Sequence, residues 1–445
     1  MPGPTEVLAR FARDARFGDL PPRTVREAHR TFLNWLGCAI GASRHAAIEN
    51  ALRAIRPIQG PPQAAILGRR ERTDIANAAL LNGISSHTFD FDDTHLKTVI
   101  HPAGPVVPAI LSLAQAQPVS GRDFVAAMVV GIEVECRIGN SVYPEHYDVG
   151  WHITGTAGVF GAAAACGRLL DLSERQMTWA LGIAATQASG VREMFGSHCK
   201  PFHPGNAARN GLFAALLARE NFTSSERGIE APRGFAHVLS TKFEPREITE
   251  NLGKTWEIDF NTYKPYACGI VIHPAIEGCA ALAREHGLKA ADIERIDLAV
   301  HPLVLELTGK RAPRVGLEGK FSVFHSSACA VIFGAAGESE YSDAVVARAD
   351  VVALRYRVDA KAKPGIAEHQ CEVRMTLKDG RVLSHFVEHV TGSVERPMTD
   401  EALDTKFRGL VEPILGAGRA TQLIAAGRAL ADSADASSFI PVATP

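Results

Sequence analysis

Hydrophobic residues recur at every third or fourth position over most of the first 262 residues, as they do along one face of a helix. Val7, Leu8 and Phe11 follow this spacing, and Pro21-Pro22 opens a second helix, because proline suits the first helical turn. The same pattern predicts helices over residues 73–83, 106–115, 121–138, 159–170, 174–188 and 206–219. The helix at 159–170 consists largely of Ala and Gly, which lets neighbouring helices approach closely. We therefore expect a helical bundle with this helix near its centre.

The pattern changes after residue 262. Apolar and polar residues alternate over 293–301 and over 351–358, which predicts strands. Two further alternating runs, 372–377 and 382–390, flank the turn sequence Lys378-Asp379-Gly380-Arg381 and predict a hairpin. A helix is expected before these strands, so this part of the chain is typical of an α+β domain.

Helical spacing returns near the C-terminus. Pro397-Met398-Thr399-Asp400 can cap a new helix, and the helical pattern continues to about residue 432. The predicted fold class is therefore mainly α with an α+β insertion. We expect a helical bundle domain built from residues 1–262 and 397–445, and a smaller α+β domain over residues 263–396. A chain of 445 residues is long enough for two domains.

Composition narrows the class of protein. Hydrophobic residues make up 46% of the chain and charged residues 22%, as in ordinary globular proteins. The formal net charge of −2 gives no overall attraction to nucleic acid or to an anionic membrane, so neither is expected as a partner. The 8 cysteines are scattered without a CxxC pair, which indicates free thiols in a reducing compartment. With no apolar leader and no spanning segment in the sequence, we expect a cytoplasmic protein.

Residues 87–108 (HTFDFDDTHLKTVIHPAGPVVP) fit neither helical nor strand periodicity. Asp90, Asp92 and Asp93 lie within four positions, Thr94 follows directly, and His101 precedes a proline and glycine turn. Neighbouring carboxylates shift one another's pKa, so the cluster can serve proton transfer. It can also hold a metal ion, or the carboxylates can cap the next helix and pair with an arginine.

Three more polar residues stand in unusual surroundings. His152 precedes the small-residue helix, either as a hydrogen-bonded helix start or as a site imidazole. Lys200, in the sequence KPFHPGN, precedes the helix at 206–219. A lysine beside the positive end of a helix suits a carboxylate or phosphate, although most lysines are solvated surface residues. Lys264, in YKPYAC, lies where the α+β domain begins.

Several motifs together make the chain resemble the MmgE/PrpD family, which includes 2-methylcitrate dehydratases, cis-aconitate decarboxylases and an iminodisuccinate epimerase. They are HTFDFDDTH with HPAGPVVPAIL, GIEVECRIG, GWHITGTAGVFGAAAACGRLLDL, KPFHPGNAARNGLFAALLA and YKPYACGIVIHP, in the family's order. The resemblance implies a helical domain formed by both chain ends, an inserted α+β lid and an active site between them. It also implies a homodimer that needs neither a metal nor an organic cofactor.

The resemblance also assigns site residues, and this chain departs from the family pattern at two places. The positions that match family site residues are Asp90, Thr94, His101, His152, Lys200 and Lys264. Where dehydratases and decarboxylases of the family typically have Phe-Ser-x-x-Tyr, this chain reads Phe-Ser-Val-Phe-His, which places His325 at the tyrosine position. The spacing from Thr94 to His101 is one residue longer than in the decarboxylases.

These observations favour a cofactor-independent lyase that abstracts a proton next to a carboxylate of a small di- or tricarboxylate. We expect His101, His152, Asp90 and His325 to be catalytic, and Lys200, Lys264 and Thr94 to bind the substrate. A dehydratase of the 2-methylcitrate type ranks first, since it uses a paired base and acid. The alternatives are a cis-aconitate type decarboxylase, an epimerase of the same family, a metal-dependent hydrolase using Asp90, Asp92 and Asp93, and a binding protein without turnover.

Overall fold

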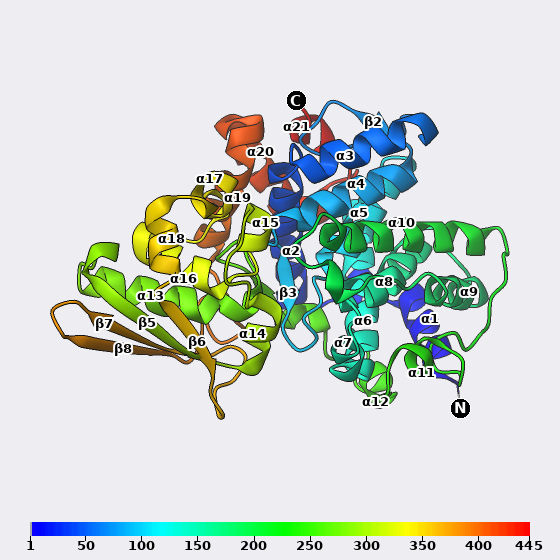
Figure 1. Cartoon of the computed structure of the whole chain (residues 1–445). Coiled ribbons are helices and arrows are strands. Elements are labelled where there is room, and N and C mark those ends of the chain that lie inside the picture. The colour runs from blue at the N-terminus through cyan, green and yellow to red at the C-terminus, as the bar shows by residue number, and fades with distance from the viewer. Residues whose placement is uncertain (1) are drawn as a thin grey trace.

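The structure is a computed structural model and describes residues 2–445. Helices dominate the first half of the chain, which lies on the right of Figure 1. They are α1 (Pro4–Asp14), α2 (Pro22–Gly41), α3 (Ala46–Ile55), α4 (Ile75–Thr88), α5 (Ala103–Ala114), α6 (Gly121–Val142), α7 (Glu145–Asp148), α8 (Ile153–Leu169), α9 (Glu174–Ala185), α10 (Cys199–Arg219), α11 (Phe235–Leu239) and α12 (Arg246–Thr249). Two short ladders, β1 (Ala64–Ala65) with β2 (Arg72–Thr73) and β3 (Asp93–His95) with β4 (Asn261–Tyr263), join these helices.

Small residues set the distance between the central helices, as expected for α8. A Cβ atom added to Gly83 of α4 would lie 2.6 Å from the Cα atom of Gly205 in α10. A Cβ atom added to Gly211 of α10 would lie 2.5 Å from the Cβ atom of Ala162 in α8. Any larger side chain at these glycines would push the helices apart. Helices α4, α8 and α10 therefore form one closely packed unit, and α4 and α8 carry site residues at their ends.

The α+β part lies on the left of Figure 1. Its sheet has the strand order β6-β5-β7-β8, in which β5 and β6 are parallel and the other neighbours antiparallel. The elements are α13 (His273–Glu285), β5 (Ile293–Val300), α14 (Pro302–Thr308), α15 (Gly316–Gly319), α16 (Val323–Phe333), α17 (Asp343–Val346), α18 (Ala349–Arg355), β6 (Val358–Ala362), β7 (Cys371–Leu377) and β8 (Val382–Val387). Ile296 and Leu298 of β5 and Val373 and Met375 of β7 are buried in one cluster with residues of α13 and α16.

Several predicted boundaries are wrong. Helix α4 ends at Thr88 and not at residue 83, and α8 begins at Ile153 and not at residue 159. The chain is helical over α18, where residues 351–358 were expected to form a strand, and β6 begins only at Val358. Val351 and Leu354 lie three positions apart, and both are buried. An apolar run this short is compatible with helical and with strand periodicity.

Helix α10 begins at Cys199 instead of residue 206. Pro201 lies in its first turn, where backbone N–H groups have no partner within the helix, so this proline does not interrupt it. Pro204 also lies inside the helix.

The chain returns to the helical part through α19 (Asp400–Leu415), α20 (Ala417–Arg428) and α21 (Ile440–Ala443), which lie near α2 in Figure 1. Phe407 and Val411 of α19 share a buried cluster with Phe32 and Leu36 of α2. The two ends of the chain thus contribute to one core. Among residues 2–445, no helix combines the length and apolar character needed to cross a bilayer.

Candidate active site

Asp90 receives two lysine side chains. It lies in the turn after α4 with a φ of 52° and is buried. Its Oδ1 accepts hydrogen bonds from Lys264 Nζ at 2.6 Å and from Lys200 Nζ at 3.0 Å. Burial raises the pKa of Asp90, but the two ammonium groups outweigh burial and hold that pKa well below its usual range. Asp90 is therefore an ionised carboxylate that positions both lysines.

Strand pairing explains why Lys264 reaches Asp90. Strand β4 ends at Tyr263, directly before Lys264, and Asp93 of β3 pairs with Tyr263. Lys406 of α19 holds the same two segments together, because its Nζ donates hydrogen bonds to the carbonyl oxygens of Phe91 and Lys264 at 2.5 and 2.9 Å. Burial lowers the pKa of Lys406 to about 8. Segments far apart in the sequence therefore fix the Asp90 turn and Lys264 against each other.

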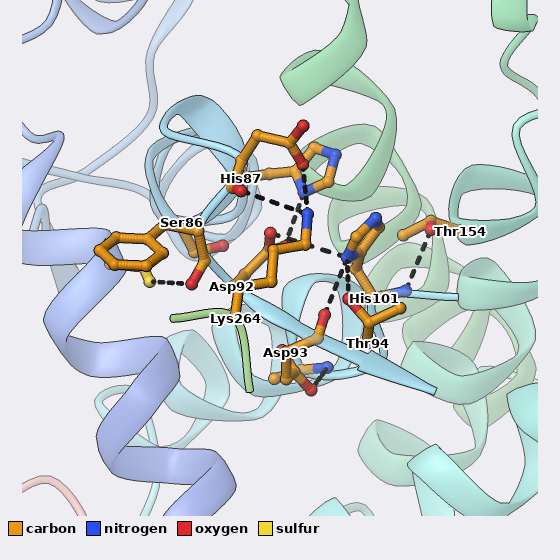
Figure 2. Close-up of polar contacts among 12 residues, drawn as sticks. Ser86, His87, Asp92, Asp93, Thr94, His101, Thr154 and Lys264 are labelled. Carbon is orange, nitrogen blue, oxygen red and sulfur yellow. Dashed lines mark hydrogen bonds and ion pairs between the residues drawn. The ribbon is translucent and has the colours of Figure 1, made fainter. Parts of the chain in front are cut away.

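His87, at the end of α4, connects a second carboxylate to Lys200. Its Nδ1 lies 2.6 Å from Asp92 Oδ2, and its Nε2 lies 3.0 Å from Lys200 Nζ. Since an ammonium group can only donate, Nε2 accepts from Lys200 and Nδ1–H donates to Asp92. Despite burial, which raises it, His87 and His101 lower the pKa of Asp92 far below its usual range. Figure 2 shows His87, Asp92 and Lys264 in this network.

His101 presents one ring nitrogen to the cavity. Its Nδ1 lies 2.8 Å from the carbonyl oxygen of Asp93 and 3.2 Å from Thr94 Oγ1, so Nδ1–H donates to that carbonyl and Nε2 keeps its lone pair. Its backbone N–H donates to Thr154 Oγ1 at 3.1 Å, as Figure 2 shows. Burial lowers the pKa of His101 to about 3, which makes it a neutral base at physiological pH.

His152 is the residue before α8, and within the described chain its side chain caps no backbone N–H of that helix. Its Nδ1 lies 2.9 Å from His203 Nδ1 in α10, and its ring packs edge-on against Phe195 at 5.1 Å between centroids. Burial, followed by the charge of Lys200, lowers the pKa of His152 well below its ordinary value. A side chain that leaves its helix uncapped and faces other imidazoles fits the site interpretation better than the helix-start interpretation.

These side chains lie at or next to one cavity. One ring nitrogen from each of His87, His101 and His152 lies within 4.8 Å of the others. The cavity is lined by Asp90, Val99, His101, Tyr147, His152, Phe195, Lys200, Lys264, Gly269, Ile270, Val271, Leu307, Thr308 and Phe321. The helical part supplies imidazoles and Lys200, whereas the α+β part supplies mainly apolar side chains. The arrangement can bind an anion at the lysines and transfer protons through neutral imidazoles.

The predicted site residues fall into three groups. Asp90, His101, His152, Lys200 and Lys264 all line the cavity. Thr94 lies behind His101 and holds its Nδ1, so it positions a histidine. Among the residues that the structure describes, His325 does not line this cavity; on α16, its Nε2–H donates to the carbonyl oxygen of Glu340 at 3.0 Å.

Sequence reasoning missed His87 and His203 as members of the site, and it considered Asp92 only within the carboxylate cluster and as a metal ligand of the hydrolase alternative. His87 and His203 both belong to the sequence motifs described above, but both lie on helices. A single polar residue on a helix is a weaker indication of a site than one in a loop. Phe195, Leu307 and Phe321 were also missed. They are ordinary apolar residues, and only the tertiary structure brings them to one cavity.

The carboxylates do not form a metal site of the proposed hydrolase type. Asp90 contacts two lysines and Asp92 contacts His87. Asp93 Oδ2 accepts from Asn261 Nδ2 at 2.8 Å and from the backbone N–H of Ala103 at 3.1 Å. Burial and the neighbouring Asp92 raise the pKa of Asp93 to about 7. Because the three carboxylates have different partners, they fit structural and anion-binding roles better than shared coordination of a cation.

Comparison with known proteins adds the following matches. The MmgE/PrpD N-terminal domain model matches residues 6–248, and the MmgE/PrpD C-terminal domain model matches residues 266–432. The cis-aconitate decarboxylase-like protein oryM of Aspergillus oryzae is 27% identical over 98% of this chain and 96% of its own length. Human cis-aconitate decarboxylase is 27% identical over 97% of this chain and 93% of its own. The 2-methylcitrate dehydratase of Cupriavidus necator is 23% identical over 83% and 82%.

Proposed function

The chain belongs to the MmgE/PrpD family, and we propose that, as a lyase of this type, it decarboxylates a small unsaturated tricarboxylate of the cis-aconitate kind. The observation that carries the proposal is the pair of buried lysines on Asp90 beside three clustered imidazoles. We further propose, from the family resemblance, that it works as a homodimer without a metal or organic cofactor.

The lysines would hold two carboxylates of the substrate. Lys200 and Lys264 are both almost fully buried, so their charges act in a medium of lower dielectric than water. Asp90 keeps them in place before the substrate arrives. A substrate carboxylate that joins this cluster is bound by charge-assisted hydrogen bonds, and its negative charge raises the pKa of the nearby histidines.

The chemical step breaks the bond between a carboxylate and its carbon. CO₂ leaves, and the electron pair that remains on the carbon spreads over the double bond towards a neighbouring carboxylate held by a lysine. A histidine that has gained a proton on substrate binding then returns it to carbon. We assign this role to His101 or His152, whose available nitrogens face the cavity. One proton is taken up from solution for each CO₂ released.

The apolar side of the cavity supports decarboxylation over dehydration. Val271, Leu307 and Phe321 line the cavity together with the lysines and imidazoles. A carboxylate placed against such side chains loses hydration, whereas the CO₂ it becomes is uncharged and apolar. The names of the relatives that cover nearly the whole chain also favour this order, which reverses the order expected from sequence.

Dehydration of a 2-methylcitrate type hydroxy acid is the second candidate. It is supported by a base and an acid at one cavity: His101 Nε2 is free to take a Cα proton, and burial lowers the pKa of Lys200 below its ordinary value, which makes Lys200 a better proton donor to departing hydroxide.

Proton NMR of the purified enzyme in D₂O tests the proposal. With cis-aconitate we expect CO₂ release and a product that carries one solvent deuteron on carbon. With citrate or 2-methylcitrate, appearance of an alkene without CO₂ would instead support the dehydratase. Proton exchange in iminodisuccinate without either product would indicate an epimerase. Absence of all three reactions would contradict the proposed function.

A further inference from the structure

A second cavity of about 100 Å³ adjoins the first. Its walls include Leu96 and Val99 from the loop after β3, Ile270 and Val271 from the segment before α13, and Val390 from the segment after β8. Val99, Ile270 and Val271 line both cavities. The two spaces therefore share one apolar wall, and the second cavity is here called the side chamber.

The shared wall contains a strained residue. Val99 has a φ of 53°, a conformation that β-branched residues rarely adopt. Such strain persists only where the surrounding structure imposes it, and it is often found at functional sites. Val99 is half-buried and lines both spaces, so its side chain lies where the side chamber meets the cavity that contains Asp90.

The polar groups of the side chamber are unevenly placed. Glu368 and His369, which also line the chamber, are exposed. His273, at the start of α13, is fully buried, and in the part of the chain that the structure describes neither of its ring nitrogens has a hydrogen-bond partner. Burial lowers the pKa of His273 to about 3, so the imidazole is neutral. The chamber is thus lined by apolar side chains and by uncharged polar groups, among them the buried Tyr263, Ser393 and His273.

We propose that the side chamber binds an uncharged, mainly apolar substituent of the substrate while the substrate's carboxylates lie at Lys200 and Lys264. This rests on the proposed function of the first cavity. A substituent of about three carbon atoms fits, taking about 30 Å³ for each, as for water in the liquid. The substrate class is therefore a di- or tricarboxylate with a short alkyl branch.

Calorimetric binding of two unreactive ligands, succinate and 2-propylsuccinate, tests this proposal. Each buried methylene should tighten binding about fourfold, so the propyl group should lower Kd by about 60-fold. Val390→Phe and Leu96→Phe each fill the chamber, and neither residue lines the first cavity in the described chain. Both variants should bind succinate as the unchanged protein does and should lose the propyl advantage. Two variants are used because Val390 is buried and a larger side chain there can impair folding.

Three results would overturn the side chamber. The first is equal affinity for the two ligands in the unchanged protein. The second is tighter binding of 2-propylsuccinate that persists in both variants. The third is equal weakening of both ligands in the variants, which would mean that these positions act on the carboxylates and not on the propyl group. Failure of the proposed function gives a different result, since it leaves cis-aconitate and citrate unconverted whatever the propyl group does. A propyl advantage without turnover would thus retain the chamber and reject the lyase.

Discussion

Lys200 and Lys264 contact the same oxygen of Asp90, yet their pKa values move in opposite directions. Burial lowers the pKa of Lys200 and is only partly offset by Asp90. Burial also lowers the pKa of Lys264, but Asp90 and Asp92 outweigh it and raise that pKa above its ordinary value. The two lysines therefore suit different tasks: Lys264 is a permanent cation, and Lys200 is the cation that can give up a proton.

Replacing Lys200 by Ala should weaken binding of a di- or tricarboxylate by about 10- to 100-fold, because a hydrogen bond to a charged group is lost. Calorimetry with an unreactive dicarboxylate measures the change. Lys363→Ala is the matched control, since Lys363 is an exposed lysine that pairs with Glu372. Unchanged affinity in Lys200→Ala would remove this lysine from the binding site.

Replacing His152 by Ala should lower kcat by about 10²- to 10⁴-fold, the range for loss of a general acid or base. The melting transition should remain cooperative, because the ring packs at the cavity. Steady-state kinetics and thermal melting measure the two effects. His203→Ala should reduce kcat less, since His203 contacts His152 without lining the cavity in the described chain. Equal losses in both variants would argue against a direct role for His152.

His325→Gln should keep kcat within about threefold of the unchanged enzyme, because the glutamine amide nitrogen can take the place of Nε2 and still donate to the Glu340 carbonyl. His325→Tyr, which restores the residue expected in the family, should mainly lower thermal stability, since His325 is fully buried and a larger ring overpacks the site. Rates and melting temperatures decide the question. A loss of activity in His325→Gln as large as in His152→Ala would make His325 catalytic.

Asp93→Asn should stabilise the protein, and more so as pH rises. The pKa of Asp93 is raised to about 7 in the folded state, whereas an unfolded aspartate has a pKa near 3.9. Between these values the unfolded chain loses a proton that the folded chain keeps, so this residue lowers stability steadily as pH increases to about 7. Asparagine keeps an acceptor for Asn261 and Ala103. Melting temperatures of both proteins from pH 5 to 8 should diverge up to about pH 7 and then run parallel.

A difference in melting temperature that did not vary with pH would contradict the raised pKa of Asp93. Asp123→Asn is a suitable control, because Asp123 is an exposed residue in the first turn of α6. It should show no such divergence.

The sequence predicted the charged half of the site better than the apolar half. Asp90, Lys200 and Lys264 stand out because charged residues beside Pro and Gly are unusual within apolar surroundings. Leu307 and Phe321 do not stand out, because the same apolar residue types occur in a buried core and in the lining of a cavity. His325 was selected because of its alignment with a family tyrosine, and an aligned position does not fix the direction in which a side chain points.

The sequence predicted the hairpin of β7 and β8 because its turn is specified locally. It failed over α18, where the choice between helix and strand depends on contacts of Val351 and Leu354 with distant residues. Similarly, the close approach of α4 to α10 follows from Gly83 and Gly205 only once their partners are known.

The pairing of β3 with β4 has a consequence for the order of events in a catalytic cycle. Lys264 is fastened to the Asp90 turn by that ladder and by Lys406, although it comes immediately before the α+β part. If the α+β part swings away, Leu307 and Phe321 leave with it, whereas both lysines, Asp90 and the imidazoles stay together. Capture of the anion can then precede its enclosure. The association rate should depend on ionic strength, and the step that excludes water should not.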